Sequence, residues 1–483
     1  MTEFDEYYSP VAWWLWLKPR AVNRSSQRIE PADRASKSSQ RIERANARDR
    51  ASRFPQADRA DPKYRPNPMS YPVALALSPP RAAYLHIPFC RRRCFYCDFP
   101  ISVVGEFKTF RDRPDQPPEP ATGRNSAPII EYLSALEREI TLGADRAAAD
   151  QPPLETVFFG GGTPSLLAPE QVDRILQLLD RRFGLAPQVE ISMELDPGTF
   201  DRAWLAGFLA AGVNRISLGV QAFQAELLAA CGRSHGVQDI EQAVALLQSA
   251  GVKNWSLDLI SGLPNQSIDQ WQASLDRAVA CGPAHLSVYD LIIEPQTVFD
   301  RRYQPGDRPL PSDEQTAQMY RMASQTLQAA GFQHYEVSNY AQFGFQCRHN
   351  RTYWENRPYY GFGMGATSYL AGQRFGRPRT RAAYYDWLNN GAIEPPASPQ
   401  SVPDRLAETL MLGLRLAEGL ALEPLRQEFG TVWVDRVLQC LDRFAAEGWV
   451  VRSGDRLALA EPDGLLFSNS ILAEIFSTLE QEP

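Results

Sequence analysis

The sequence lacks any apolar run that is long enough to cross a membrane or to form the core of a secretory signal. A membrane helix needs about 20 consecutive apolar residues, whereas the apolar stretch near the N-terminus covers only residues 11–17. The residues before it include Glu3, Asp5 and Glu6, although a secretory signal begins with positive charge. We therefore expect a cytoplasmic protein without a transmembrane segment.

Basic charge is scarce outside one segment. Residues 18–65 hold 14 Lys or Arg against 6 Asp or Glu, so the formal net charge of −7 leaves −15 for the rest of the chain. Nucleic-acid binding requires basic surface that neutralises phosphates. The acidic remainder therefore predicts that nucleic acid is not a partner.

Large apolar residues are also few in residues 18–68. The run Ser-Ser-Gln-Arg-Ile-Glu at 25–30 returns at 38–43. Such a segment cannot bury enough surface to offset its ordering entropy, and we expect residues 1–68 to be a disordered N-terminal extension. Two alternatives are a basic arm for a membrane or nucleic acid, and a leader that precedes a true start at Met69.

Cysteine is infrequent, with seven residues in 483, and three of them lie within eight positions. An odd number in a large chain without a secretory signal argues against a disulfide framework. A reducing cytosol fits better, and there clustered cysteines indicate metal or redox chemistry.

From residue 84 onward, short apolar runs of strand type alternate with helical patterns. Strands are predicted at residues 83–87, 156–159, 189–194, 215–218, 254–260 and 285–289. Helices are predicted between them, at residues 130–142, 169–183, 203–211 and 238–250. Strand–helix alternation at this spacing predicts a parallel α/β barrel or part of one.

The pattern changes after about residue 400. Helices are predicted at residues 406–416, 423–429 and 433–447, then a hairpin of residues 449–452 and 456–459, then a last helix from Ser468. Helices followed by a hairpin are typical of a winged-helix module. We therefore divide the chain into the extension (1–68), a barrel (69–375) and a small C-terminal winged-helix-like domain (376–483).

Cys90, Cys94 and Cys97 give the strongest chemical signal, directly after the first predicted strand. Their Cys-x₃-Cys-x₂-Cys spacing brings three thiolates around one [4Fe–4S] cluster, where each thiolate binds one iron. The fourth iron is then left for the amine and carboxylate of a substrate. The alternative is a zinc site of three cysteines and one histidine, with His86 as the fourth ligand.

With the preceding run Tyr-Leu-His-Ile-Pro-Phe at 84–89, this loop resembles the oxygen-independent coproporphyrinogen III oxidase family of the radical S-adenosylmethionine (SAM) superfamily. The resemblance covers roughly residues 80–480. It implies an α/β fold with a partial parallel barrel of radical SAM type, and it implies two cofactors, the [4Fe–4S] cluster and SAM.

Other strand ends match this family in the expected order. Consecutive glycines after the second strand let free backbone groups meet the methionine amine of SAM. Acidic side chains can accept from ribose hydroxyls, and a guanidinium can pair with the methionine carboxylate. Singly, each of these residues could equally be a turn or capping residue. The resemblance implies a SAM site made of Tyr84, Tyr96, Gly161, Gly162, Thr163, Glu194, Gln221, Arg233 and Asp258.

Two positions separate the branches of the family. The oxidases resemble one another in a further cysteine two residues after the triplet, where this sequence has Phe99. This difference argues against oxidation of coproporphyrinogen III. Further along, the run from His349 through Tyr353 and Trp354 is similar to the His-Asn-x-x-Tyr-Trp motif of the heme chaperones known as HemW. A neutral imidazole can ligate heme iron, and aromatic rings offer flat apolar surface to a porphyrin.

The resemblance thus implies a heme chaperone that carries a cluster and SAM, binds heme through His349, and passes it to acceptor hemoproteins, respiratory ones among them. An electron donor for the cluster is a further implied partner. By spacing alone, His349 is instead a loop residue packed by aromatic rings. Two other functions stay open, an anaerobic coproporphyrinogen III oxidase and a radical SAM activity on an unrelated substrate, so the sequence does not decide whether the chain is an enzyme.

Overall fold

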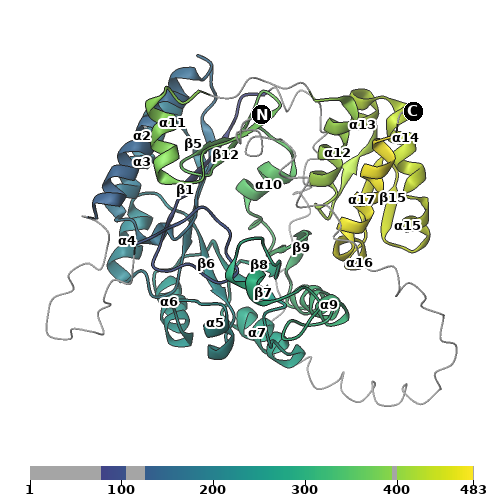
Figure 1. Cartoon of the computed structure of the whole chain (residues 1–483), viewed down its shortest axis with the longest axis horizontal. Coiled ribbons are helices and arrows are strands. Elements are labelled where there is room, and N and C mark those ends of the chain that lie inside the picture. Colours follow the sequence, from purple (N-terminus) through teal and green to yellow (C-terminus); the bar gives the residue numbers. More distant parts are fainter. Residues whose placement is uncertain (1–77, 105–125, 394–399, 482–483) are drawn as a thin grey trace.

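The computed structural model describes residues 78–104, 126–393 and 400–481. The predicted disorder of residues 1–68 lies outside these ranges. A nine-stranded sheet occupies the centre of the described chain, with helices along its outer side and a second helical group at the C-terminus (Figure 1). None of the described helices is long and apolar enough to span a membrane.

The central sheet is parallel from β11 to β8, while β10 is antiparallel to both β8 and β9. In spatial order its strands are β11 (Tyr360–Phe362), β1 (Ala82–Ile87), β4 (Leu154–Gly161), β5 (Leu185–Leu195), β6 (Arg215–Gln221), β7 (Trp255–Ser261), β8 (His285–Asp290), β10 (Asn339–Ala341) and β9 (Gln333–Glu336). All six predicted strands are confirmed, and the parallel β/α arrangement with them.

Helices connect the strands of the sheet or follow them. They are α2 (Ala127–Arg146), α3 (Pro169–Phe183), α4 (Arg202–Ala210), α5 (Ala225–Ala230), α6 (Val237–Ser249), α7 (Ile268–Ala280), α8 (Val298–Arg302), α9 (Asp313–Ala329), α10 (Arg348–Trp354) and α11 (Arg381–Asn389). The four predicted helices are confirmed as α2, α3, α4 and α6. Local sequence explains several starts: before α7, Ser267 accepts from the amide of Gln270, whose side chain accepts from the amide of Ser267.

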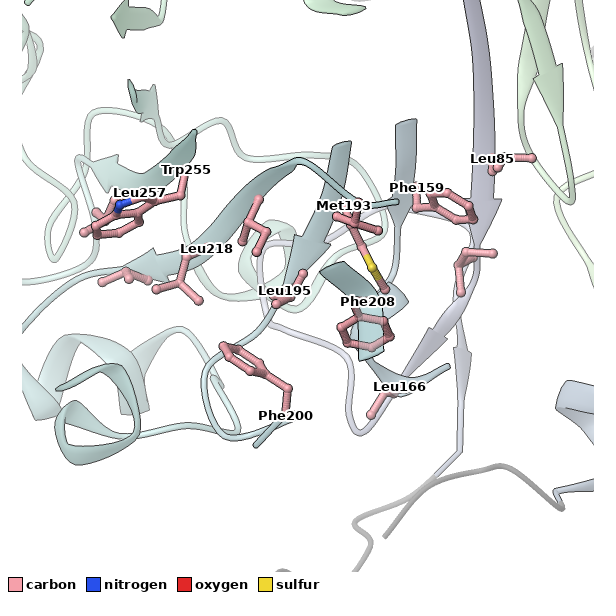
Figure 2. Packing of buried hydrophobic residues seen from close by; sticks show 14 of the residues in the cluster. Leu85, Phe159, Leu166, Met193, Leu195, Phe200, Phe208, Leu218, Trp255 and Leu257 are labelled. Atoms are coloured by element: carbon pink, nitrogen blue, oxygen red, sulfur yellow. The ribbon is translucent and has the colours of Figure 1, made fainter. Parts of the chain in front are cut away.

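Alternation along the strands separates an apolar outer face from a polar inner face. Met193, Leu218 and Leu257 are buried in the main hydrophobic cluster, and Phe208 of α4 packs in the same layer (Figure 2). Burying each such side chain contributes roughly 1.5–3 kcal/mol. The residues that follow Met193 and Leu257, Glu194 and Asp258, line a cavity inside the barrel. Because successive residues of a strand face opposite sides of the sheet, the polar residues face the inside of the barrel and the apolar residues face the helices that cover its outside.

Short elements complete the barrel. They are the 3₁₀ turn η5 (Pro164–Leu166), the pair β2 (Phe89–Cys90) and β3 (Ser102–Val103), and the hairpin β12 (Thr367–Leu370) and β13 (Gln373–Gly376). Neither strand pair was predicted from the sequence pattern.

The C-terminal module has the predicted order of helices and hairpin. It comprises α12 (Val402–Gly413), β14 (Leu420–Ala421), α13 (Leu422–Phe429), α14 (Thr431–Cys440), α15 (Asp442–Ala446), β15 (Val450–Ser453), β16 (Arg456–Leu459), α16 (Asp463–Leu466) and α17 (Ser468–Leu479). The helix predicted over residues 433–447 is present as two consecutive helices, α14 and α15, which Leu441 separates.

The module has a hydrophobic cluster of its own, which Tyr320 of α9 joins. The helix α11, in contrast, packs on α2 of the barrel. The division of the chain at residues 375 and 376 stays a prediction.

A buried carboxylate on α2 bonds to residues of the segment that follows β11. Glu139 is 3% exposed and accepts from the amide of Gly363 at 2.7 Å, the hydroxyl of Tyr384 at 2.6 Å and Nε of Arg377 at 2.8 Å. The guanidinium of Arg377 is also buried. This ion pair connects α2, α11 and the segment after β11.

We expect Glu139→Ala to lower the free energy of unfolding by about 3 kcal/mol or more, because it leaves the Arg377 charge buried without its partner. Urea unfolding measures this as a lower midpoint. The matched control is Glu137→Ala on the same helix, which breaks an ion pair with the largely exposed Arg174 and should cost about 1 kcal/mol or less. Equal losses in the two variants would contradict this assignment.

Candidate functional site

The cysteine loop, residues 90–97, follows β1 and carries three free, partly buried thiols. Two donors point at its sulfurs: the Thr163 hydroxyl lies 3.6 Å from Cys90 Sγ, and Nη1 of Arg233 lies 3.4 Å from Cys94 Sγ. Burial raises the pKa of Cys90 to about 12 and that of Cys97 to about 11. A bound cation reverses this preference, because a coordinating thiol is deprotonated.

His86 is not available as a fourth ligand, which argues against the zinc alternative. Its ring is buried, with Nδ1 bonded to the Tyr84 hydroxyl at 3.1 Å and Nε2 to the carbonyl of Pro100 at 2.9 Å. No group of three or more His, Cys, Asp or Glu side chains in the described ranges already converges as a metal site. Three thiols without a fourth protein ligand are the donor set that suits a [4Fe–4S] cluster with one open iron.

The glycine turn, residues 160–163, is held directly against the cysteine loop. A Cβ on Gly162 would lie 2.6 Å from the carbonyl oxygen of Ile87, and Gly161 has φ of +103°, so both positions require glycine. The amides of Gly161, Gly162 and Thr163 donate to Glu194, Ile87 and Phe89. Of the backbone groups expected to be free for a ligand, these three amides are therefore occupied, and the expectation for the carbonyl groups stays a prediction.

Arg233 connects this turn to the cysteine loop. Its Nη2 donates to Asp196 Oδ1 at 2.6 Å and to the carbonyl of Gly219 at 3.0 Å, and its Nη1 lies 3.3 Å from the Tyr96 hydroxyl. The Thr163 hydroxyl lies 3.4 Å from the other carboxylate oxygen of Asp196. Asp196 is the residue that sequence reasoning missed, because it follows a strand end two positions after the better signal Glu194.

Gln221 ends β6 in a conformation that few side chains adopt, with φ of +69°. The side chain of Gln221 folds back over Gly219, because a Cβ added to Gly219 would lie only 3.1 Å from Nε2 of Gln221. Backbone strain of this kind is found at functional sites, which agrees with the expected role of Gln221 beside Arg233.

A cavity of ≈ 230 Å³ inside the barrel brings the two predicted sets of residues together. Tyr84, Gly161, Glu194 and Asp258 line it from the SAM set, and His349 lines it from the heme set. The chain achieves this because β11, which follows α10, pairs with β1. Residues separated by about 250 positions therefore meet in one cavity, whose full lining is Tyr84, Phe99, Phe158, Gly161, Glu194, Arg215, Ser217, Asp258, Ser287, Tyr289, His349, Asn350 and Tyr353.

The acids of the cavity are held toward their neutral forms. Burial, reinforced by the charge of Asp258, raises the pKa of Glu194 to about 8. Burial also raises the pKa of Asp258, although hydroxyls of Ser217 and Ser256 donate to its carboxylate at 3.0 and 3.1 Å. A protonated Glu194 can donate a hydrogen bond to a ligand as well as accept one.

His349 lies at the start of α10, with a side chain that is 1% exposed. Its Nδ1 is 2.8 Å from the Thr156 hydroxyl and its Nε2 is 2.8 Å from the Tyr353 hydroxyl, while its ring stacks on Phe158. Burial, followed by the charge of Arg215, lowers the pKa of His349 to about 3. The imidazole is therefore neutral, which is the form that ligates a metal.

The two aromatic residues of the motif have different surroundings. Tyr353 lines the cavity. Trp354 does not; its ring lies 5.9 Å from the guanidinium carbon of Arg415, beside the C-terminal module. The expectation that both rings offer surface to a porphyrin is wrong for Trp354, because adjacent helical positions face different directions.

Comparisons with known proteins agree with this arrangement. The family model described as the Radical SAM superfamily matches residues 84–278, and that described as the HemN C-terminal domain matches residues 400–467. The heme chaperone HemW of Synechocystis is 46% identical over 83% of the chain and 98% of that protein. The heme chaperone HemW of Escherichia coli is 34% identical over 82% of the chain and 98% of that protein.

The solved structure of the coproporphyrinogen III oxidase HemN from Escherichia coli has a similar fold. Its TM-score is 0.69 at 23% identity, over 84% of this chain and 92% of that one.

We predict that Cys90→Ser, Cys94→Ser or Cys97→Ser abolishes cluster assembly, because each thiolate is an iron ligand that no neighbouring group replaces. Iron and sulfide analysis after anaerobic reconstitution measures this. The control Cys281→Ser changes a cysteine outside the loop and should keep the cluster. Zinc at full occupancy in place of iron would contradict the cluster assignment.

Proposed function

Because the chain belongs to the family of the heme chaperone HemW, within the radical SAM superfamily, we propose that it binds heme and transfers it to acceptor hemoproteins. The observation that carries this proposal is that His349 and Tyr353 line the same cavity as the residues expected at SAM. Radical SAM proteins carry a [4Fe–4S] cluster and SAM, and this family membership extends both cofactors to the chain.

We propose that Cys90, Cys94 and Cys97 hold the cluster and that the SAM site lies beside it. Tyr96, Gly162, Thr163, Gln221 and Arg233 would form the part next to the cysteine loop. Tyr84, Gly161, Glu194 and Asp258 would form the part that faces the cavity. When bound, cluster and SAM supply one-electron chemistry, for which the chain needs an electron donor.

For heme, we propose that Nε2 of His349 is the atom that meets the iron. Nε2 bonds to Tyr353, which lines the cavity, whereas Nδ1 bonds to Thr156, which does not. A proton on Nδ1 that is donated to the Thr156 hydroxyl leaves the Nε2 lone pair free to ligate. Metal-ligating histidines are oriented in this way by a partner on the other nitrogen. Heme binding then replaces the hydrogen bond from Tyr353.

The cavity must widen to admit a whole porphyrin. Its ≈ 230 Å³ is below the roughly 300–1,000 Å³ of sites for drug-sized ligands. Phe99 and Tyr289 line it and are 53% and 43% exposed, so they supply apolar surface at its open side. We propose that heme enters past these two residues.

We expect His349→Ala to change the Soret band of bound heme and to weaken binding by about tenfold or more, because an axial ligand is lost. Hemin titration of the purified protein measures both. His285→Ala is the matched control: His285 is also buried and bonded to a serine and a tyrosine hydroxyl, but it does not line the cavity. An unchanged Soret band in the His349 variant would remove His349 as the ligand.

We also expect no SAM-dependent conversion of coproporphyrinogen III to protoporphyrinogen by the cluster-loaded protein. Position 99 holds an apolar side chain at the edge of the cavity, where the oxidases resemble one another in having cysteine. An anaerobic assay with porphyrin analysis of the products tests this. Robust conversion would favour the oxidase instead of the chaperone.

A further inference from the structure

Arg215, the first residue of β6, carries a positive charge inside the barrel without a direct ion pair in the described residues, and the carboxylates of Glu190 and Asp258 act on it only at longer range. Its side chain is among the largest fully buried ones, with 1% exposure, and it lines the cavity. Its Nε has no hydrogen-bond partner, and no carboxylate of the described chain lies within ion-pair distance of it. Buried charges are usually paired, because an unpaired one is strongly destabilising.

The acids nearest to Arg215 are engaged elsewhere. Glu190 accepts from the amides of Arg348 and His349, both at 3.1 Å, and so caps the start of α10. Asp258 accepts from the hydroxyls of Ser217 and Ser256. The charge of Arg215 nevertheless acts on two neighbouring histidines. Burial is the main cause that lowers the pKa of His285 and of His349, and the positive charge of Arg215 is the second cause.

We propose that Arg215 binds a carboxylate of the ligand that enters this cavity, and that this carboxylate is a propionate of heme. The inference rests on the proposed heme-binding function. The surroundings admit an anion, since Tyr289 and Asn350 line the same cavity and carry hydrogen-bond donors. Burial raises the pKa of the two acids that also line it, Glu194 and Asp258, which reduces their repulsion of an anion. A guanidinium matches a carboxylate with two parallel hydrogen bonds.

SAM also carries a carboxylate, but its place is at the other end of β6. Arg215 begins the strand, whereas the carbonyl of Gly219 contacts Arg233 beside the cysteine loop. Four residues of strand separate these positions by about 13 Å. Arg233 is therefore the guanidinium near the cluster, and Arg215 lies beside His349 at the deeper end.

The test compares hemin with hemin dimethyl ester, in which both propionates are blocked, by Soret titration of the full chain. We expect the wild-type protein to bind hemin more tightly than the ester by about tenfold or more. Arg215→Gln should lose most of this preference by weakening hemin binding while it changes ester binding little. Arg215→Lys should keep part of the preference, because it keeps the charge. Arg181→Gln, an exposed position on α3, is the control for loss of a positive charge.

Several outcomes would overturn the inference. Equal affinity of the wild-type protein for hemin and the ester removes the propionate contact without any variant, so the test survives a variant that fails to fold. Equal loss of both ligands in Arg215→Gln would show that Arg215 maintains the cavity and does not bind a propionate. If Arg215→Gln loses SAM binding but still prefers hemin to the ester, then Arg215 binds the carboxylate of SAM and not a propionate of heme. No binding of either porphyrin by the wild-type protein would instead refute the proposed function itself.

Discussion

The pairing of β1 with β4 is the constraint on which the candidate site depends. Its register sets His86 opposite Gly160 and Ile87 opposite Gly161, so the loop after β1 lies against the turn after β4. Gly162 and Thr163 donate their amides to Ile87 and Phe89 across this contact. A shift of one residue would turn every side chain of β1 to the other face and would separate Cys90 from the Thr163 hydroxyl.

The other edge of β1 explains how a distant segment reaches the same place. β11 pairs with β1, and the chain just before it forms α10, whose first amides are capped by Glu190 of β5. These two attachments hold His349 inside the barrel. Interior polar groups are costly unless they are satisfied, and the hydroxyls of Thr156, Ser217 and Ser256 satisfy most of those that face inward. Arg215, whose Nε has no hydrogen-bond partner in the described residues, is one of the exceptions, and it lines the cavity where a ligand could meet it.

Sequence pattern predicted the strands because outward residues such as Met193 and Leu218 are apolar and buried under helices. It predicted the cysteine loop because spacing alone defines a chelating set. It could not find Asp196 or Arg215, because one directly follows a strand and the other begins a strand, and charged residues at strand ends are normally solvated. The pattern also could not predict that amides of the glycine turn donate hydrogen bonds to the carbonyls of Ile87 and Phe89, since these bonds depend on the register between β1 and β4, about 70 residues apart. The expected place of Trp354 at the cavity was wrong because a sequence motif gives the order of residues and not the direction in which each side chain points.

His349 and His285 show why hydrogen bonding alone does not identify a ligand. Each has a hydroxyl on Nδ1, from Thr156 or Ser256, and a tyrosine hydroxyl on Nε2, from Tyr353 or Tyr335, at 2.8–2.9 Å. Burial lowers the pKa of both rings, so both are neutral. What differs is the phenol: Tyr353 lines the cavity and Tyr335 does not. A ligand that displaces Tyr353 gains His349 directly, whereas reaching His285 would require breaking the packed core around it. Whether a ligand can reach a buried histidine therefore depends on whether the hydrogen-bond partner of that histidine lines a cavity.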